Sequence, residues 1–517
     1  MRIAGASPKR VRILGQEERE GEGVAYRIRR PEQPTQEGWK LTAATRYLCA
    51  AAHLQPKFRR RIIQQFAEEP YRAMAPSFGI DPTTVLKHCF AARRQENMRD
   101  LFLVFAWIIG GIISAITFPP GGFFVFLALT CLIIVIDRWK TQSLVRSNLL
   151  KSNFDPDCVP EPESRQFHRA ATELKQAQES NVLVSSGFSP FAGAGHDVSG
   201  WSFALDIDKG KEEFGKIVQP QSFSVSELND AIARNIQALK IDGLTIEDKL
   251  CVNGQDIRDN RKILPDPIRR PVTMLTQDVL QSIIRDPAPH MRHYQHIRVV
   301  NWEGELVVSA FLRVCKPGHN LFIEVNYCLV PPLSETYHAI DSLNPFLNWS
   351  EWLNLILLSG ITAAFMAIFL PFIVLQHTIS PFHRWQERSK AKRAVRENAA
   401  FNYGSLGSLR ELASVSVYRR YFQKLDKEMN MKILERQIFD TIIDFLDAKG
   451  IDTSDLKERQ TTLLNNGLVV SGSGTIQAES LAVGAGSQAL ASKVRQGSIR
   501  LLERTIGKSA SPGQGQV

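Results

Sequence analysis

Three histidines lie close together in the sequence, at positions 290, 293 and 296. A zinc site needs several such ligands that converge at about 2.1 Å from the ion. The segment is rich in β-forming residues, and side chains three positions apart on a strand point to opposite faces. Arg292, between two of the histidines, would also repel a cation. We therefore interpret the histidines as polar residues at the start of a strand and predict no metal site.

A glycine-rich segment at residues 187–197 is a candidate for anion binding, because exposed backbone N–H groups in such loops can cradle a phosphate. The candidate ligand residues are Gly187, Ser189, Gly193 and Gly195. Ser189, His196 and Asp197 also carry the residue types of a hydrolase. However, the segment has no G-x-S-x-G motif and no Walker lysine, and a strand is expected after it instead of a helix. A structural loop is the favoured interpretation, with ligand binding as the alternative and catalysis as the least supported.

A basic run is the second candidate for binding, and it consists of Arg384, Arg388, Lys390, Lys392, Arg393 and Arg396. It follows an apolar stretch directly and contains one aromatic residue, Trp385, so we expect no nucleic-acid binding. Each such cation contributes about 1 kcal/mol near an anionic leaflet. The expected partner is therefore a lipid bilayer with anionic headgroups. In contrast, the acidic residues at 206–213 alternate with lysines, which indicates a solvated surface and not a metal site.

The seven cysteines form no C-x-x-C pair and are odd in number. This argues against a disulfide framework or a thiolate zinc site and is typical of a reducing compartment. We predict no cofactor and no catalytic residue. The 517-residue chain carries 63 Lys and Arg against 53 Asp and Glu, a net charge of +10 that suits anionic partners.

Residues 101–136 contain no charged side chain, and Asp100 and Asp137 enclose them. Since about 20 apolar residues suffice to span a bilayer, we interpret this stretch as two membrane helices. Proline and glycine weaken helices, so the turn is expected at Pro119-Pro120-Gly121-Gly122. A second uncharged stretch, residues 353–376, is long enough to span once.

Basic residues flank both ends of the predicted hairpin, which places both ends in the cytoplasm. The third segment has its basic residues only after it, and a single crossing would therefore conflict with a cytoplasmic start. Either the segment is re-entrant and bends at Gly360 or Pro371, or one hairpin helix does not cross, or the charge rule fails here. We favour the re-entrant arrangement, in a multi-pass protein of the plasma membrane whose soluble parts are mainly cytoplasmic.

The fold class expected from these patterns is a membrane-anchored α+β protein. A helix should begin at Pro82, capped by Asp81, and a capping box at Ser224 and Glu227 should open another. Alternating runs at 296–302, 306–314 and 321–330 predict an antiparallel sheet with helices on one face. The predicted regions are a mobile basic tail (1–40), a helical region (41–100), the hairpin (101–137), a linker (138–164), the α+β domain (165–340), the third membrane segment (353–376), a basic and helical region (377–466) and a Gly/Ser-rich β-like tail (467–517).

Residues 421–446 predict a long helix with an apolar stripe that includes Leu425, Met429 and Ile433. Such a stripe must be buried, either on the protein's own core or on a second copy of the chain. We therefore expect a homo-oligomer formed through the C-terminal helices and tail as one alternative. The sequence identifies no other protein partner. The tail itself fits short strands joined by tight turns and a flexible segment equally well.

Several short segments resemble a group of uncharacterised actinobacterial membrane proteins. They are 46–53 (RYLCAAAH), 186–191 (SGFSPF), 201–204 (WSFA), 456–462 (LKERQTT) and 478–484 (AESLAVG). The resemblance implies no activity, so no functional residue is transferred. The glycine-rich end is also similar to tails on proteins of bacterial conflict and phage-defence loci.

The sequence suggests two alternative functions. The first is a non-enzymatic integral membrane scaffold or signalling component that holds a cytoplasmic α+β domain at the membrane. The alternative is a ligand-gated membrane effector, of the kind used in bacterial defence, whose α+β domain senses a small anionic ligand. An enzyme that acts on lipid-borne substrates is a more distant third.

Overall fold

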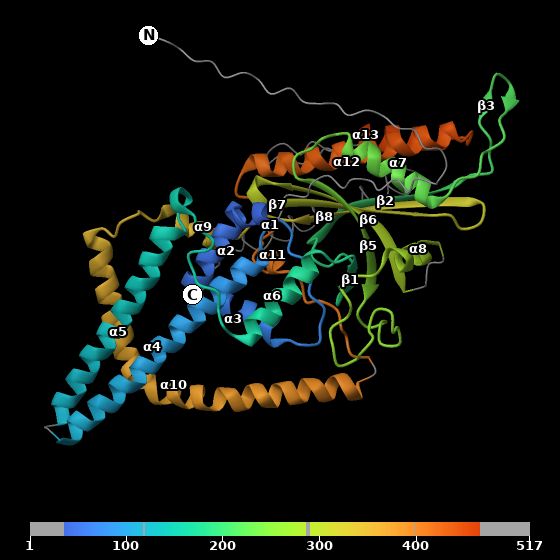
Figure 1. Ribbon diagram of the computed structural model, residues 1–517. Helices are drawn as coiled ribbons and strands as arrows, with labels where there is room; N and C mark the ends of the chain where they lie inside the picture. Colours follow the sequence, from blue (N-terminus) through green and yellow to red (C-terminus); the bar gives the residue numbers. More distant parts are fainter. Residues whose placement is uncertain (1–35, 117–118, 286–289, 399, 466–517) are drawn as a thin grey trace, which may run out of the picture.

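A computed structural model describes residues 36–116, 119–285, 290–398 and 400–465 (Figure 1). The predicted Gly/Ser-rich tail at 467–517 lies outside these residues, as does most of the predicted basic tail. Residues 36–40 of that basic tail form a short helix, α1 (Gln36–Lys40). The chain has the predicted α+β class.

The centre of the fold is a six-stranded sheet in the order β1-β5-β6-β7-β8-β2. Its strands are β1 (Val182–Ser185), β2 (His196–Asp206), β5 (Leu244–Asn253), β6 (Met291–Asn301), β7 (Leu306–Cys315) and β8 (Asn320–Val330). The predicted antiparallel meander is present in β6, β7 and β8. The prediction of a purely antiparallel sheet was wrong, because β1 pairs with β5 in parallel. A separate hairpin joins β3 (Glu212–Glu213) and β4 (Lys216–Ile217).

Helices cover one face of the sheet, as Figure 1 shows. They are α7 (Val225–Gln237), which opens with the predicted Ser224 and Glu227 capping box, and α12 (Tyr421–Ala448). Ile232 of α7, Ile323 of β8 and Ile438 of α12 share one buried apolar core. On the opposite face two loop residues pack on the strands: Phe191 stacks on Phe311 at 4.1 Å, and Phe78 lies over Arg298.

The stripe predicted on α12 divides into two halves. Its second half is buried against the sheet through Ile438, Ile442 and Leu446. In its first half Leu425, Met429 and Ile433 are exposed, and Met429, for example, is 51 % accessible. Burial on the protein's own core therefore accounts for half of the stripe only. The helix α13 (Ser454–Asn465) follows it.

A second core lies beside the sheet, in the N-terminal helical region. It is formed by α2 (Ala43–Leu54), α3 (Pro56–Ile62), a π-helical turn (Ile63–Glu68), the start of α4 (Pro82–Ile116) and α6 (Arg165–Gln178). Leu48, Ile62, Phe66, Leu86 and Phe167 are buried together in it. Short elements complete the chain: α8 (Gln277–Arg285), α9 (Glu335–His338), α11 (Leu409–Leu412) and the 3-10 turns Lys151–Asn153, Trp302–Gly304 and Ala339–Ser342.

The predicted hairpin is formed by α4 and α5 (Pro119–Asn148), which pack side by side away from the sheet (Figure 1). Asp81 caps α4 as expected and accepts a hydrogen bond from the Thr83 amide at 3.0 Å. The predicted position of the turn was wrong, because Pro119 begins α5. Proline is tolerated in the first turn of a helix, where its missing N–H would have no helical partner.

The second uncharged stretch, residues 353–376, lies within α10 (Trp349–Glu397), which is helical through both Gly360 and Pro371. In Figure 1 the first part of α10 runs along α5, and the helix then changes direction and passes below the globular part. Both ends contact the rest of the protein. Near the start, Glu351 forms an ion pair with Arg146 of α5 at 3.1 Å, and near the end the Val395 carbonyl accepts from Arg258 at 3.0 Å.

Candidate functional site

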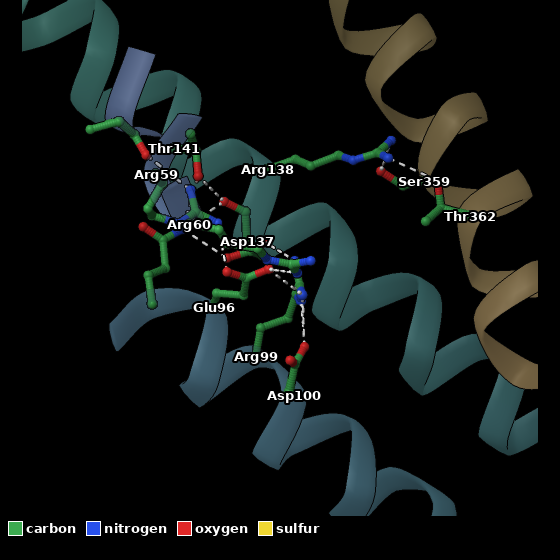
Figure 2. A network of polar contacts seen from close by, with 12 residues as sticks. Arg59, Arg60, Glu96, Arg99, Asp100, Asp137, Arg138, Thr141, Ser359 and Thr362 are labelled. Atoms are coloured by element: carbon green, nitrogen blue, oxygen red, sulfur yellow. Dashed lines mark hydrogen bonds and ion pairs between the residues drawn. The ribbon is translucent and has the colours of Figure 1, made fainter. Parts of the chain in front are cut away.

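Ionised side chains gather where α4 and α5 leave the globular part, and we call Arg59, Arg60, Glu96, Arg99, Asp100 and Asp137 the charged belt (Figure 2). Arg59, from α3, lies 2.7 Å from the Glu96 carboxylate and also donates to the Ala52 carbonyl at 2.9 Å. Arg60 contacts the other oxygen of Glu96 at 3.1 Å. Burial raises the pKa of Glu96, but the two arginines outweigh it and hold the pKa below its ordinary value.

The second half of the belt is centred on Arg99. Its guanidinium lies 2.7 Å from Asp100 and 3.5 Å from Asp137, the two carboxylates that enclose the uncharged stretch of the sequence. Gln95 donates a further hydrogen bond to Asp137 at 2.7 Å. The acidic residues at the two ends of the hairpin are thus paired with one cation between them, as partly buried charges require.

Arg138 follows Asp137 in the chain but points the other way, across to α10 (Figure 2). It donates to Ser359 Oγ at 3.3 Å and to Thr362 Oγ1 at 2.8 Å. Both hydroxyls donate their own protons to carbonyls one turn earlier in α10, each at 2.6 Å. Among the described residues Arg138 has no carboxylate within 4.0 Å, unlike the arginines of the belt.

A cavity of about 570 Å³ lies between α4, α5 and α10, below the ends of α2 and α3. Its charged lining residues are Arg59, Arg99, Arg138, Arg146, Glu96, Asp137 and Glu351. Leu54, Leu355 and Leu358 contribute apolar wall, and His53 lies at the edge formed by α2. A cavity with both apolar and cationic walls suits an amphipathic anion better than it suits covalent chemistry.

The glycine-rich loop lies elsewhere, in the segment that connects the two edge strands of the sheet, β1 and β2. Gly195 has φ +88°, and its N–H donates to the Glu411 carboxylate at 2.8 Å. A Cβ atom on Gly195 would stand 1.9 Å from the Leu329 carbonyl oxygen. Burial raises the pKa of Glu411, although backbone amides that include those of Gly195 and Gly193 oppose this rise.

The remaining residues of that loop are more open. Gly187 has free space around it, and half-buried Ser189 donates to Asp197 at 3.4 Å. His196 is exposed on β2, where it pairs with Leu329. A carboxylate of the protein itself therefore occupies the amide of Gly195 that was predicted to bind a ligand, and the ligand role of the loop stays a prediction.

The predicted lipid-binding run lies on the second part of α10. Arg388, Lys390, Lys392, Arg393 and Arg396 are exposed there, while the side chain of Arg384 is outside the described residues. Val395, on the same stretch, is buried in the core beside β1 and β5. This part of α10 is therefore amphipathic, with cations toward solvent and its apolar side against the domain.

The three clustered histidines are separated in the structure. His293 lies 2.9 Å from Asp248, buried His296 lies 2.9 Å from Ser309, and exposed His290 lies 3.7 Å from Asp256. Within the described part of the chain, no group of three or more His, Cys, Asp or Glu is arranged to hold a metal.

Sequence reasoning used Asp137 and Arg138 only as markers of a helix end and of membrane orientation. It missed Arg59, Glu96 and Glu411 entirely. One local signal was available, since Ser359 and Thr362 are hydroxyl residues three positions apart on an otherwise apolar helix and so share one face. The ion pairs had no such signal, because their partners are far apart in the sequence.

Comparison with known families gives one match. A family model described as the AbeC-like domain matches residues 200–477, more than half of the chain. The matched region includes most of β2, all of α7, the meander, α10 and the C-terminal helices, but not α4 and α5. No curated protein and no solved structure matches the chain.

Proposed function

The chain belongs to the family defined by the AbeC-like domain, and we propose that this member is an integral membrane protein that holds its α+β domain against a bilayer. In this role it acts as a non-enzymatic scaffold or signalling component. The bilayer is the plasma membrane, and the domain lies on its cytoplasmic side. The name of the family carries no reaction, so the proposal depends on the geometry of α4, α5 and α10.

One observation carries the proposal: α4, α5 and the first part of α10 present large apolar side chains that are exposed. In the most apolar windows of α4 and α5, only 17 % and 22 % of the residues are buried. The core helix of a soluble protein would be mostly buried. The exposed large side chains include Phe102, Phe105, Ile108 and Ile112 of α4, Phe124, Leu132 and Ile136 of α5, and Leu353, Leu357, Ile361 and Phe365 of α10. A continuous apolar surface of this kind is stable only against lipid or another protein.

The charged belt supports the same orientation. Arg59 of α3, Glu96 and Arg99 of α4 and Asp137 of α5 lie where the hairpin leaves the globular part, which is where lipid headgroups would meet the protein. The tip of the hairpin carries no charge. Because charged residues are costly in hydrocarbon, the uncharged tip is the end that enters the bilayer.

The two ends of α10 support the re-entrant arrangement. Its start is held by Arg146, and its end is held by Arg258, which donates to the carbonyls of Val395, Arg396 and Asn398. Both anchoring residues belong to one folded body. A helix whose two ends contact that body would enter and leave the membrane on the same side, next to the exposed cations of its second part.

We expect the full-length protein to sediment with membranes from a lysate prepared without detergent, to resist an alkaline carbonate wash and to dissolve in a mild detergent. The matched control is a variant with Phe422→Ser and Met429→Ser, which removes apolar surface from the exposed half of α12. It should sediment as the wild type does. Wild-type protein in the supernatant would contradict the proposal, and release by the α12 variant alone would attribute sedimentation to self-association.

Topology has its own test, with single cysteines at Glu335→Cys and Ser389→Cys, on exposed positions before and within α10. In intact cells both should be protected from a membrane-impermeant thiol reagent, and both should react after permeabilisation. The wild-type chain, with its native cysteines, gives the background. Labelling of only one position in intact cells would mean that α10 crosses the membrane once.

The exposed half of α12 is also where self-association is expected. Phe422, Leu425, Met429 and Ile433 are exposed at spacings of three and four residues, which places them on one side of the helix. A second copy of the chain could cover this surface without disturbing the half that packs on the sheet. The homo-oligomer therefore remains part of the proposal.

A further inference from the structure

We propose that the cavity between α4, α5 and α10 binds a phosphate group and that Arg138 is its principal ligand. The expected ligand is a phosphate group, carried either by an amphipathic lipid or by a small soluble anion. The proposed membrane location makes a lipid headgroup the expected source, and in this respect the inference rests on the proposed function.

Positive charge exceeds negative charge around the cavity. The cavity is lined by four arginines and three carboxylates. With Arg60 and Asp100 of the charged belt, the count is five arginines to four carboxylates. Arg59 and Arg60 pair with Glu96, Arg99 pairs with Asp100 and Asp137, and Arg146 pairs with Glu351. Arg138 remains as the cation whose partners are neutral hydroxyl groups. A bound anion would supply the missing negative charge, and an arginine is well suited to hold it because its planar group can donate two parallel hydrogen bonds to a phosphate.

The guanidinium of Arg138 has more N–H donors than its two hydroxyl partners use. A guanidinium carries five N–H groups. Ser359 and Thr362 accept hydrogen bonds from two of the nitrogens of Arg138. These hydroxyl groups are uncharged, so they do not neutralise the positive charge of the guanidinium. The guanidinium is held across the gap between α5 and α10 (Figure 2), so its remaining donors are already oriented before a ligand arrives.

The cavity lies next to the exposed apolar surface of α10. Its apolar wall includes Leu355 and Leu358 of α10, and the exposed residues Leu357 and Ile361 continue along the same helix. A lipid whose phosphate met Arg138 could extend its acyl chains along this surface and the hairpin. A simple cross-link between α5 and α10 would need the same two hydroxyl contacts but would not need the cavity.

The test uses the full-length protein in a mild detergent and measures its melting temperature. Short-chain phosphatidylglycerol is the lipid probe, short-chain diacylglycerol is the probe without phosphate, and inorganic phosphate is the soluble probe. We expect phosphatidylglycerol at saturation to raise the melting temperature by about 2–4 °C and diacylglycerol to have no effect. The variant Arg138→Gln should lose this rise. Arg419→Gln, which changes an exposed arginine on the loop before α12 and outside the cavity lining, should keep it.

Each outcome decides the inference. A rise with the lipid probe that depends on Arg138 supports a lipid phosphate, and one with inorganic phosphate supports a soluble source. No rise with either probe, or a rise unchanged in Arg138→Gln, would overturn the site. If Arg138→Gln does not fold, Leu358→Trp provides the second variant, because Leu358 is exposed and a bulky ring there should close the cavity and remove the rise.

The membrane proposal and the phosphate site can be contradicted independently of each other. Arg138→Gln should still sediment with membranes, so loss of the lipid effect with intact sedimentation concerns the site alone. If the wild type does not sediment, the inorganic phosphate arm still tests the cavity.

Discussion

Replacing Arg410 by alanine is expected to lower the free energy of unfolding by about 3–5 kcal/mol. Arg410 is 0 % exposed and donates to three carbonyl oxygens: Glu305 at 2.7 Å, Pro331 at 2.8 Å and Gly304 at 3.2 Å. Burial lowers the pKa of Arg410 to about 10, with Glu305 and Glu411 opposing the change, so the side chain is charged at neutral pH. Its removal would leave these carbonyls without their donor and create a void.

The effect should be large because Arg410 lies where distant parts of the chain meet. Beside it, Glu305 lies 2.9 Å from His338 of α9 and accepts from Gln423 of α12 at 3.1 Å. Loss of Arg410 would therefore loosen the contact between the strands, the N-terminal helical region and α12 together. Residues that share one such network do not contribute independently.

Urea unfolding of the full-length protein in detergent, followed by circular dichroism, measures the change. Arg410→Met, which keeps most of the volume, should recover part of the loss, because it removes the void but not the unpaired carbonyls. Arg419→Ala, at an exposed position on the following loop, should change stability by less than about 0.5 kcal/mol. A loss below about 1 kcal/mol for Arg410→Ala would contradict this account.

The sequence predicted those elements whose cause is local. The uncharged stretch at 101–136 gave two helices, because an apolar surface that long has few alternatives. The capping box at Ser224 gave the start of α7, and alternation gave the meander. In each case a few neighbouring residues contain the whole physical reason.

Strand β5 was missed because its pattern includes buried charge. Lys249 is almost fully buried and lies 2.7 Å from Glu247 on the same strand. An alternating pattern that places a lysine on an inner face does not read as a half-buried strand. The parallel pairing with β1 was missed with it, because both strands of that pair have to be recognised before their direction can be argued.

The glycine-rich loop shows how composition can serve two purposes. Gly195 is needed for its positive φ and its close approach to the Leu329 carbonyl, and its N–H is used by a carboxylate. A ligand-binding loop would have the same composition. Only the position of Glu411, 216 residues further along the chain, distinguishes the two, and no local pattern could supply it. The same limit applies to the charged belt and to Arg138.

Acid is expected to destabilise the protein through His53. The geometry fits a chain in which neutral His53 donates from Nε2 to His88 Nδ1 at 3.0 Å and His88 donates from Nε2 to the Pro156 carbonyl at 3.2 Å. Burial, together with the charges of His88 and Arg59, lowers the pKa of His53 to about 3. A proton on His53 would enter at Nδ1, a buried atom without a hydrogen-bond partner among the described residues, and would place a charge in the N-terminal core.

The direction of this pH effect follows from the pKa values of His53 in the folded and unfolded states. In the unfolded chain the pKa of histidine is about 6.5. Below that pH the unfolded state binds a proton that folded His53 does not, so the free energy of unfolding falls as the pH falls. The slope approaches about 1.4 kcal/mol per pH unit and continues until the pH nears the folded value. The titration of His53 therefore leaves the free energy of unfolding unchanged above about pH 6.5 and lowers it progressively at more acid pH.

Urea midpoints at pH 7, 6 and 5 measure this slope in detergent. His53→Gln keeps a side-chain N–H that can donate to His88 but does not titrate, so its stability should fall less steeply with acid than that of the wild type. His196→Gln, at an exposed position on β2 away from this pair, is the control and should keep the wild-type slope. If His53→Gln and the wild type lost stability in parallel, the acid sensitivity would have to come from other groups, and the buried pair would be only a packing contact between α2 and α4.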